Sequence, residues 1–297
     1  MTLYTQIDSN IRKTWFYITG FLIVVIFLGW LFSYIFGSQI ILLVAVIYAF
    51  LTSFLSYWYS DKIVLAITKA RPIEKQDNPE LYRIVENLCI TAGLPLPKIY
   101  ILNEAQPNAF ATGRDPQHAV VAVTTGLLER LEKTELEGVI SHELAHIGNR
   151  DALLQTMVVV LVGVIAVLSN IFFRISFRSR SSRDDRKGGG IIILLGVLAV
   201  ILAPLVANLI KLAISRKREF LADASGSLLT RYPEGLARAL EKISQDPTPL
   251  RVASNTTSHL FIINPLRGKE RESWLTKIFS THPPIEERIK ALRGMEI

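Results

Sequence analysis

Two histidines and a glutamate stand close together in the segment Ser141-His142-Glu143-Leu144-Ala145-His146. On a helix, residues four apart lie on one face, so the imidazoles of His142 and His146 can bind the same metal ion. Zinc is the metal that this pair favours, because a site of two neutral imidazole nitrogens and one carboxylate suits zinc and leaves a fourth coordination position for water. Glu143 can reach that water without binding the metal, so we expect it to act as the general base. The alternative is a helix whose histidines are simply solvated.

A catalytic zinc site needs a third ligand, and the stretch from Ser215 to Asp223 offers one. Glu219 and Asp223 are four residues apart and therefore share a face of a second helix. We expect Glu219 to bind the metal and Asp223 to hold the N–H of one histidine, which fixes its tautomer. Asn149 and Asp151 follow the second histidine, and we expect them either to end that helix or to support the ligands. Acidic pairs at this spacing are also common on solvated helix faces.

The segment from Asn108 to Gly113 contains small residues around one aromatic side chain. We expect an exposed edge strand here, to which an extended peptide can bind through its backbone with little demand on sequence. The residues of this candidate substrate strand are Asn108, Ala109, Phe110 and Ala111. The alternative is an ordinary strand of the sheet.

Among the remaining histidines, His282 directly precedes Pro283 and Pro284. Its imidazole is a candidate hydrogen-bond donor to the oxyanion that forms when water attacks a peptide. The alternative for His282 is a packing role at the start of a helix. His118 and His259 belong to no such motif, and we expect both to be structural or surface residues.

The hydrophobic residues that must carry this site are unevenly distributed along the 297 residues. Three runs, 14–60, 152–173 and 188–210, contain no Asp, Glu, Lys or Arg. A membrane-spanning helix needs about 20 apolar residues, so the first run is long enough for two spans. We therefore expect a mainly α integral membrane protein, and an ordinary soluble globular fold is excluded. The four predicted hydrophobic segments are about 15–36, 40–59, 152–173 and 191–214.

The domain order follows from these segments. Residues 1–60 form a short leader and a transmembrane hairpin, and residues 61–151 form the first part of a catalytic domain with the HExxH helix. Residues 152–214 hold the other two hydrophobic segments, and residues 215–297 complete the catalytic domain with the third ligand. The local predictions are a helix from the Asn78-Pro79 cap to Gly93, strands at Ile99–Leu102 and Ala119–Thr124, and a capping box Thr134-x-x-Glu137 that opens the metal helix. That helix ends where the third segment begins, so the two are expected to be continuous.

The net charge of +7 has a simple explanation in a membrane protein, because basic residues beside the spans meet anionic headgroups. No module of basic and aromatic residues typical of nucleic-acid binding is present, so we expect no nucleic-acid partner. Cys89 is the only cysteine, which rules out a disulfide within the chain and fits a reducing compartment. The first run is longer than the core of a signal peptide and lacks a small-residue cleavage site, so we expect it to be retained.

The orientation in the membrane depends on basic residues near the span ends. Residues 61–151 and 215–297 must share one side, because His146 and Glu219 have to meet at one metal. That side has ten such residues, whereas the opposite loop, 174–190, has six. This excess predicts a multi-pass protein of the cell membrane with its catalytic side in the cytoplasm. The six residues are unusual in a translocated loop, so a re-entrant last pair of segments remains an alternative.

These features together resemble the HtpX family of membrane-embedded zinc metalloproteases, which are related to the endopeptidases that process prenylated CAAX proteins. The resemblance extends over essentially the whole chain. The segments that carry it are His142-Glu143-x-x-His146-x-x-Asn149-x-Asp151, Ser215-Arg216-x-x-Glu219-Phe220-x-Ala222-Asp223, Asn108–Gly113 and Ser280-Thr281-His282-Pro283-Pro284-Ile285-Glu286-Glu287-Arg288. It implies an α+β zincin-like metalloprotease domain with a small edge-strand sheet, and one zinc ion per chain held by His142, His146 and Glu219. It also implies Glu143 as the catalytic acid and base, and a role in quality control of membrane proteins.

The leading function is therefore a membrane-embedded zinc endopeptidase that acts on polypeptides, above all misfolded or damaged membrane proteins. The main alternative is a non-catalytic membrane chaperone or scaffold with a structural metal, which would not need a base at Glu143. A transporter is disfavoured, because the proposed spans hold essentially no ionisable residues. The sequence gives no indication of the oligomeric state.

Overall fold

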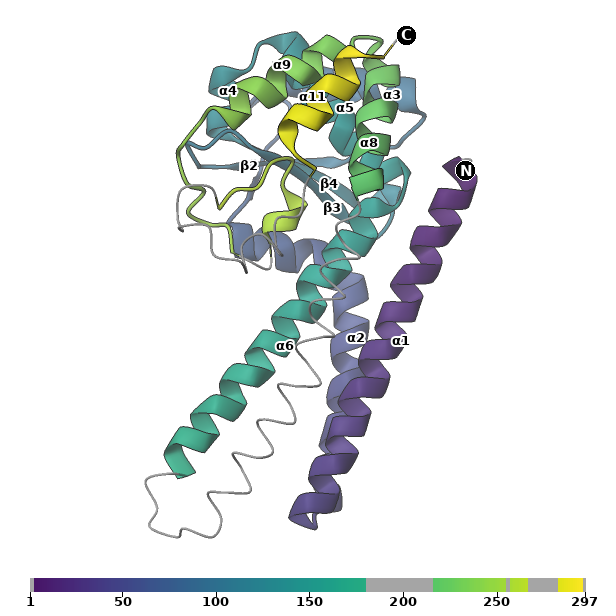
Figure 1. Ribbon diagram of the computed structural model, residues 1–297, viewed down its shortest axis with the longest axis vertical. Helices are drawn as coiled ribbons and strands as arrows, with labels where there is room; N and C mark the ends of the chain where they lie inside the picture. Colours follow the sequence, from purple (N-terminus) through teal and green to yellow (C-terminus); the bar gives the residue numbers. More distant parts are fainter. Residues whose placement is uncertain (1–2, 180–215, 255–256, 267–282, 296–297) are drawn as a thin grey trace.

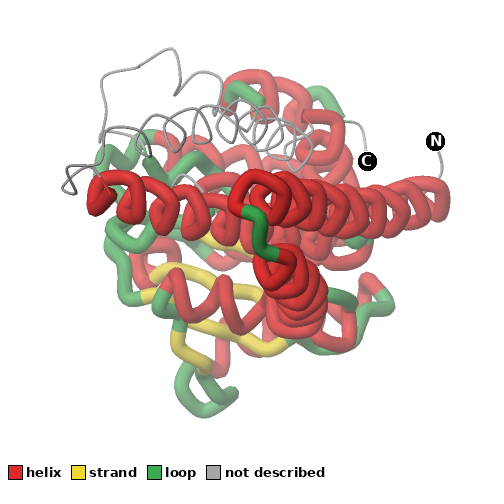
Figure 2. Tube along the Cα trace, turned by 90° about the horizontal axis from the view of Figure 1, so that it is seen from below, coloured by secondary structure: helices red, strands yellow, loops and turns green. Residues whose placement is uncertain are grey.

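The structure consists of a globular part, which contains a small sheet, and of long helices that extend from it (Figure 1). The structure, a computed structural model, describes residues 3–179, 216–254, 257–266 and 283–295. The first two helices are α1, Leu3–Phe36, and α2, Gln39–Thr68, and both are long and apolar enough to cross a membrane. Because α1 begins at Leu3, the expected leader belongs to the same helix as the first span. Seen from below, a short loop joins the two helices into the predicted hairpin (Figure 2).

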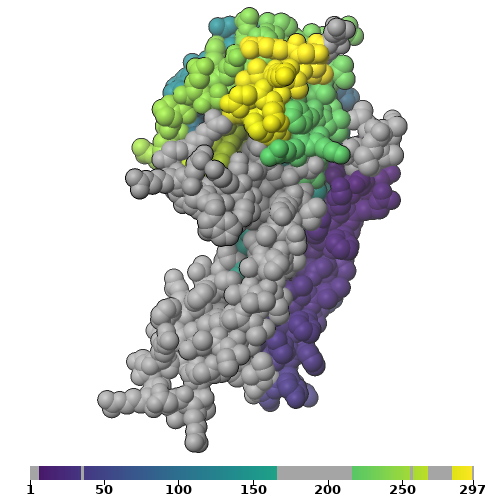
Figure 3. All heavy atoms as spheres, in the orientation of Figure 1, coloured from purple at the N-terminus to yellow at the C-terminus, as the bar shows by residue number. Residues whose placement is uncertain are grey.

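The hairpin packs closely on itself and on α6, Asp151–Ser179. A methyl group at Gly29 of α1 would lie 2.2 Å from the Cβ of Ala45 in α2, so only glycine permits this approach. One apolar cluster joins the three helices through Phe21, Val25, Leu28, Phe32, Ala49, Val158, Leu161, Val162 and Ile165. Figure 3 shows α1, in purple, along the outside of the molecule. Other large apolar side chains of the hairpin are exposed, as expected for contact with lipid: Ile23, Phe27, Ile47, Phe50 and Phe54.

The metal helix and the third hydrophobic segment are not continuous. α5, Lys133–Gly148, and the first part of α6 are bent by 80° at a short break. Arg150 lies at this break with a left-handed φ of 59°, which interrupts the helical hydrogen bonds. The expectation that the metal helix and the third segment are continuous was therefore wrong. The described chain contains two candidate spans, or three if the bent pair counts as one, and the predicted segment 191–214 lies outside the described residues.

The sheet of the globular part has four strands in the order β1-β2-β4-β3. The strands are β1, Arg71–Pro72, β2, Lys98–Leu102, β3, Ala109–Gly113, and β4, Ala119–Thr124. β2 and β4 are parallel, whereas β3 runs antiparallel to β4 and ends the sheet. The two strands predicted from β-branched residues are thus confirmed, and β3 supplies the edge.

The described part of the globular region also has six helices. They are α3, Pro79–Ala92; α4, Thr125–Arg130; α5; α8, Arg216–Thr230; α9, Pro233–Ser244; and α11, Ile285–Arg293. α5 packs on the sheet, α8 and α9 pack on α5, and α11 packs on α9. The predicted ends of α3 are confirmed, because Asn78 accepts the N–H of Leu81 and Gly93 takes a left-handed φ of 64°. The predicted capping box of α5 is wrong by two residues. Glu132 and Glu135 form the reciprocal bonds instead, since the helix already begins at Lys133.

Cys89 lies in the main core between α3 and its neighbours, where its side chain is 3% exposed. Burial raises the pKa of the thiol to about 11, and the thiolate is the reactive form. We therefore expect Cys89 in the folded protein to react with iodoacetamide at pH 7 at least about 100-fold more slowly than in the unfolded chain. Mass spectrometry with and without denaturant measures this difference. Rapid labelling of the native protein would contradict the burial of Cys89.

Candidate metal centre

The metal centre is formed where α8 crosses α5. Gly226 of α8 lies directly against the backbone of α5, since a Cβ there would be 2.9 Å from the nitrogen of His142. Gly138 makes a similar approach to α9 possible, with a Cβ position 2.6 Å from the nitrogen of Leu236. Gly226 thus brings α8 close enough to α5 for Glu219 to reach both histidines.

The ligand atoms of His142, His146 and Glu219 all lie within 4.8 Å of one another, and all three side chains are buried. The two Nε2 atoms are 3.1 Å apart. The Glu219 oxygens lie 3.8 Å from Nε2 of His142 and 3.6 Å from Nε2 of His146. In a tetrahedral zinc site with bonds of about 2.0–2.1 Å, ligand atoms are about 3.3–3.5 Å apart. The three side chains therefore fit a zinc ion without rearrangement of the backbone.

Each histidine has a carboxylate on the side away from the other ligands. Asp223 lies 2.9 Å from Nδ1 of His142, as the sequence predicted, and Asp151 lies 3.4 Å from Nδ1 of His146. Such partners fix the tautomer and orientation of a metal-binding imidazole. Asn149, in contrast, is the C-cap of α5, and no described residue hydrogen-bonds its side-chain nitrogen. The left-handed turn at Arg150 is the reason that Asp151, rather than Asn149, faces His146.

Arg288 of α11 is a central residue of the site that the sequence reasoning assigned no role. Its side chain is 0% exposed and donates two hydrogen bonds to Asp223, of 2.8 and 2.6 Å. A third bond of 2.9 Å goes to the carbonyl of Ile262, and Nη1 lies 3.7 Å from Glu219. Burial by itself raises the pKa of Asp223, but the Arg288 guanidinium and the bond to His142 hold that pKa below its ordinary value. The sequence feature that could have pointed to Arg288 is its position one turn into the helix that follows Pro283-Pro284.

Replacing Arg288 by glutamine leaves the buried carboxylate of Asp223 without its counter-charge. We expect the free energy of unfolding to fall by about 3–5 kcal/mol, the usual cost of breaking a buried ion pair. Thermal unfolding in detergent measures this loss. Arg293 of the same helix is the matched control, because its pairs with Glu234 and Glu241 are solvent-exposed and Arg293→Gln should have a far smaller effect. Equal effects of the two substitutions would contradict this account.

Glu143 lies next to the ligands with a side chain that is 1% exposed. No described residue hydrogen-bonds its Oε1. Burial raises the pKa of Glu143 to about 7. A carboxylate with an unpaired oxygen and a pKa near neutrality is suited to taking a proton from water and returning it.

The candidate substrate strand lies at the sheet edge, as expected, but it is not exposed. Side chains from Asn108 to Ala111 are at most 2% exposed. The outer side of β3 is already partly paired, because Ile262 donates its N–H to the carbonyl of Ala109 at 3.0 Å. The side-chain amide of Asn108 also donates to the carbonyl of Ile263 at 3.0 Å. The expectation of an open edge was wrong at these positions, because the chain after α9 returns along β3.

The other histidines lie away from the ligands or outside the described residues. His118 is exposed and pairs with Asp115 at 2.7 Å. His259 is buried, and its Nε2 lies 3.4 Å from the carbonyl of Gln155. His282, the predicted oxyanion donor, is outside the part of the chain that the structure describes, so its role remains a prediction.

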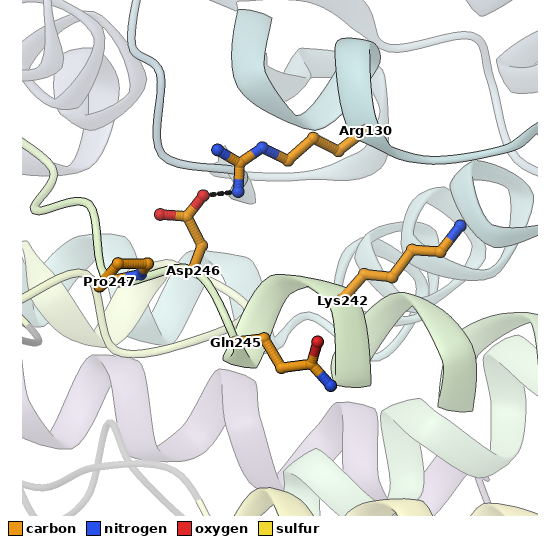
Figure 4. Close-up of a pocket in the computed structure, with 5 residues that line it drawn as sticks. All are labelled: Arg130, Lys242, Gln245, Asp246 and Pro247. Carbon is orange, nitrogen blue, oxygen red and sulfur yellow. Dashed lines mark ion pairs between the residues drawn. The ribbon is translucent and has the colours of Figure 1, made fainter.

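A surface pocket of about 360 Å³ lies at the ends of α4 and α9 (Figure 4). It is lined by Arg130, Lys242, Gln245, Asp246 and Pro247. Its charges are already paired within the protein. Arg130 forms an ion pair with Asp246, and Lys242 lies 2.8 Å from Glu135. The pocket contains none of the residues of the metal centre.

Three side chains that could hold a metal ion, a neighbouring carboxylate that can exchange a proton, and an adjacent edge strand are the parts of a metallopeptidase. Here the site is joined directly to helices that can cross a membrane. The fold and the site thus define a membrane metallopeptidase.

Comparison with known proteins identifies the family. The model of peptidase family M48 matches residues 75–296. A protein named "Protease HtpX homolog" from Thermoanaerobacter pseudethanolicus is 46% identical over 99% of this chain and 98% of its own length. A protein of the same name from Pyrococcus furiosus is 49% identical over 88% of this chain and 89% of its own length. The chain belongs to peptidase family M48, among the HtpX proteases.

A solved structure supports the fold. The crystal structure of Ste24p from S. mikatae matches with a TM-score of 0.50 and 20% sequence identity. The match covers 98% of this chain and 66% of the Ste24p chain, so this chain spans about two thirds of that protein's length. At this identity the match bears on the fold alone.

Proposed function

We propose that this membrane metallopeptidase is a zinc-dependent endopeptidase in which His142, His146 and Glu219 hold one zinc ion and Glu143 is the catalytic acid and base. The observation that carries the proposal is the fit of three buried ligand atoms, 3.1–3.8 Å apart, beside the unpaired oxygen of Glu143. When bound, zinc polarises the scissile carbonyl and makes water a stronger nucleophile at neutral pH. Glu143 takes a proton from the water and returns it to the leaving amine.

In this proposal an extended substrate lies along β3. The support is the position of β3 at the end of the sheet and its packing against α5, the helix that carries Glu143. Since the Ala109 carbonyl is occupied by Ile262, pairing with a substrate begins at Ala111 and continues toward Gly113. Backbone pairing makes recognition tolerant of sequence, as a protease of damaged proteins requires.

We propose membrane proteins as the substrates and quality control as the role. The supporting observation is that α6 begins at Asp151, five residues after His146, and runs from the globular part in the same direction as the hairpin helices (Figure 1). A segment that leaves the bilayer near α6 therefore reaches the site over a short distance. Unfolded segments of membrane proteins meet this condition.

The experiment that tests the proposed activity uses the full-length protein purified in detergent. We expect about one zinc ion per chain and cleavage of casein, with loss of both after treatment with a chelator. Return of cleavage on addition of zinc completes the test. Bound zinc without any cleavage would instead favour the chaperone or scaffold, and a protein that binds no zinc would overturn the proposal.

The proposed cytoplasmic side of the catalytic domain is tested with single cysteines in a Cys89→Ser background. Lys75 lies on the globular part with a side chain that is 59% exposed, and Gln39 is exposed at the far turn of the hairpin. We expect Lys75→Cys to resist a membrane-impermeant thiol reagent in intact cells and to react after lysis. Gln39→Cys should react in intact cells. The reverse pattern would place the active site outside the cytoplasm.

A further inference from the structure

The first helix, α1, contacts Asp151, the carboxylate that faces His146 in the proposed metal centre. Asn10 of α1 is 1% exposed, and its side-chain nitrogen donates to Oδ1 of Asp151 at 2.7 Å. The same nitrogen donates to the backbone carbonyl of Asn149 at 2.9 Å. Asn10 and Asp151 are 141 residues apart in the chain. One amide of the N-terminal helix therefore holds both a carboxylate and the end of the metal helix.

The carboxylate of Asp151 is fixed at both of its oxygens. Oδ1 accepts the bond from Asn10, whereas Oδ2 faces Nδ1 of His146 at 3.4 Å. Arg218 at the start of α8 adds a positive charge, with its Nε 3.6 Å from Oδ1. A carboxylate held in this way can keep one orientation toward the imidazole, which in turn directs the other imidazole nitrogen toward the metal.

The chemical nature of Asn10 is important for this arrangement. A neutral amide can orient the Asp151 carboxylate without cancelling its charge, so that charge remains available to His146. Both bonds come from the amide nitrogen of Asn10, whereas its Oδ1 has no hydrogen-bond partner among the described residues. The donor bonds to Asp151 and to the carbonyl of Asn149 therefore set the orientation of this buried side chain.

We propose that Asn10 is a positioning residue of the metal centre, through which the first membrane helix strengthens zinc binding by fixing Asp151 against His146. The inference rests on the proposed zinc site. It implies that the hairpin is more than an anchor, because part of the ligand support comes from α1. Displacement of α1 from the domain should then loosen the metal even if the catalytic domain stays folded.

The competing explanation is that Asn10 only joins α1 to the domain, as polar residues often do between membrane helices. Thr14, one turn further along the same buried face, separates the two explanations. It is 1% exposed, and among the described residues its hydroxyl bonds the carbonyl of Asn10 within the helix and no other group. Thr14→Ala therefore disturbs the packing of α1 without touching Asp151.

The test compares Asn10→Asp with Thr14→Ala in full-length protein. Aspartate has the shape of asparagine, but it cannot donate to Asp151 and repels it. We expect the zinc dissociation constant, measured by competition with a chelator, to rise about tenfold or more for Asn10→Asp. For Thr14→Ala it should stay within about twofold of the wild type. Unchanged zinc affinity in a folded Asn10→Asp protein, or equal losses in both variants, would overturn the inference.

An exchange of the two side chains provides a second measurement. In the double variant Asn10→Asp/Asp151→Asn, one amide and one carboxylate again face each other, and the new amide oxygen can still accept from His146. We expect the double variant to bind zinc more tightly than either single variant. If Asn10→Asp does not fold, recovery of folding and zinc binding in the double variant supports the inference, and failure to recover overturns it. Absence of zinc from the wild type would instead show that the proposed zinc site is wrong.

Discussion

Replacing Glu143 by glutamine is expected to leave zinc bound and to lower the rate of peptide cleavage by about 10²–10⁴-fold or more. The amide keeps the shape of the side chain but cannot accept a proton from water. Glu143 is buried beside the ligands, and no described residue hydrogen-bonds its Oε1, so this oxygen is available to take the proton. The measurements are turnover of casein and zinc content of the purified variant.

Glu137→Gln is the matched control for this prediction. Glu137 lies on the same helix, is only partly buried and faces Lys133 at 3.9 Å, so its loss should leave cleavage nearly unchanged. A zinc-loaded Glu143→Gln protein that cleaves casein at close to the wild-type rate would show that another group is the base.

Removal of the third ligand should have the second large effect. Glu219→Ala, like His142→Ala and His146→Ala, is expected to release zinc on dialysis, because two side chains cannot hold the ion in a closed site. Asp223→Ala should weaken binding by only about 10–100-fold, since Asp223 acts through His142. Zinc content by elemental analysis, followed by titration with a chelator, separates these two classes.

The order of these effects tests the assignment of roles. If Glu219→Ala kept its zinc while loss of Asp223 or Asp151 emptied the site, the third ligand would be a different carboxylate. Thermal unfolding without metal should be recorded for each variant, because Asp223 and Arg288 also stabilise the fold through their buried ion pair. A loss of zinc that follows only from unfolding would not count as a ligand effect.

The sequence by itself determined the features that depend on neighbouring residues. The spacing of His142 and His146 places both imidazoles on one face of any helix, whatever surrounds it. Asn78 and Gly93 delimit α3 because capping is a contact within one turn. The length of the first uncharged run predicted the hairpin, since the thickness of a bilayer sets the length of a span. The family resemblance from motifs was likewise confirmed.

The tertiary structure decided which distant groups meet. Asp151 rather than Asn149 supports His146, because a left-handed residue at 150 bends the chain by 80° there. Arg288 and Asn10 reach the site from α11 and α1, far apart in the chain, so their bonds to Asp223 and Asp151 depend on how these helices pack on the domain. β3 is buried at its outer side because residues 261–263 return to it. Helical periodicity and capping follow from the geometry of a few successive peptide units, whereas these contacts depend on how whole elements pack.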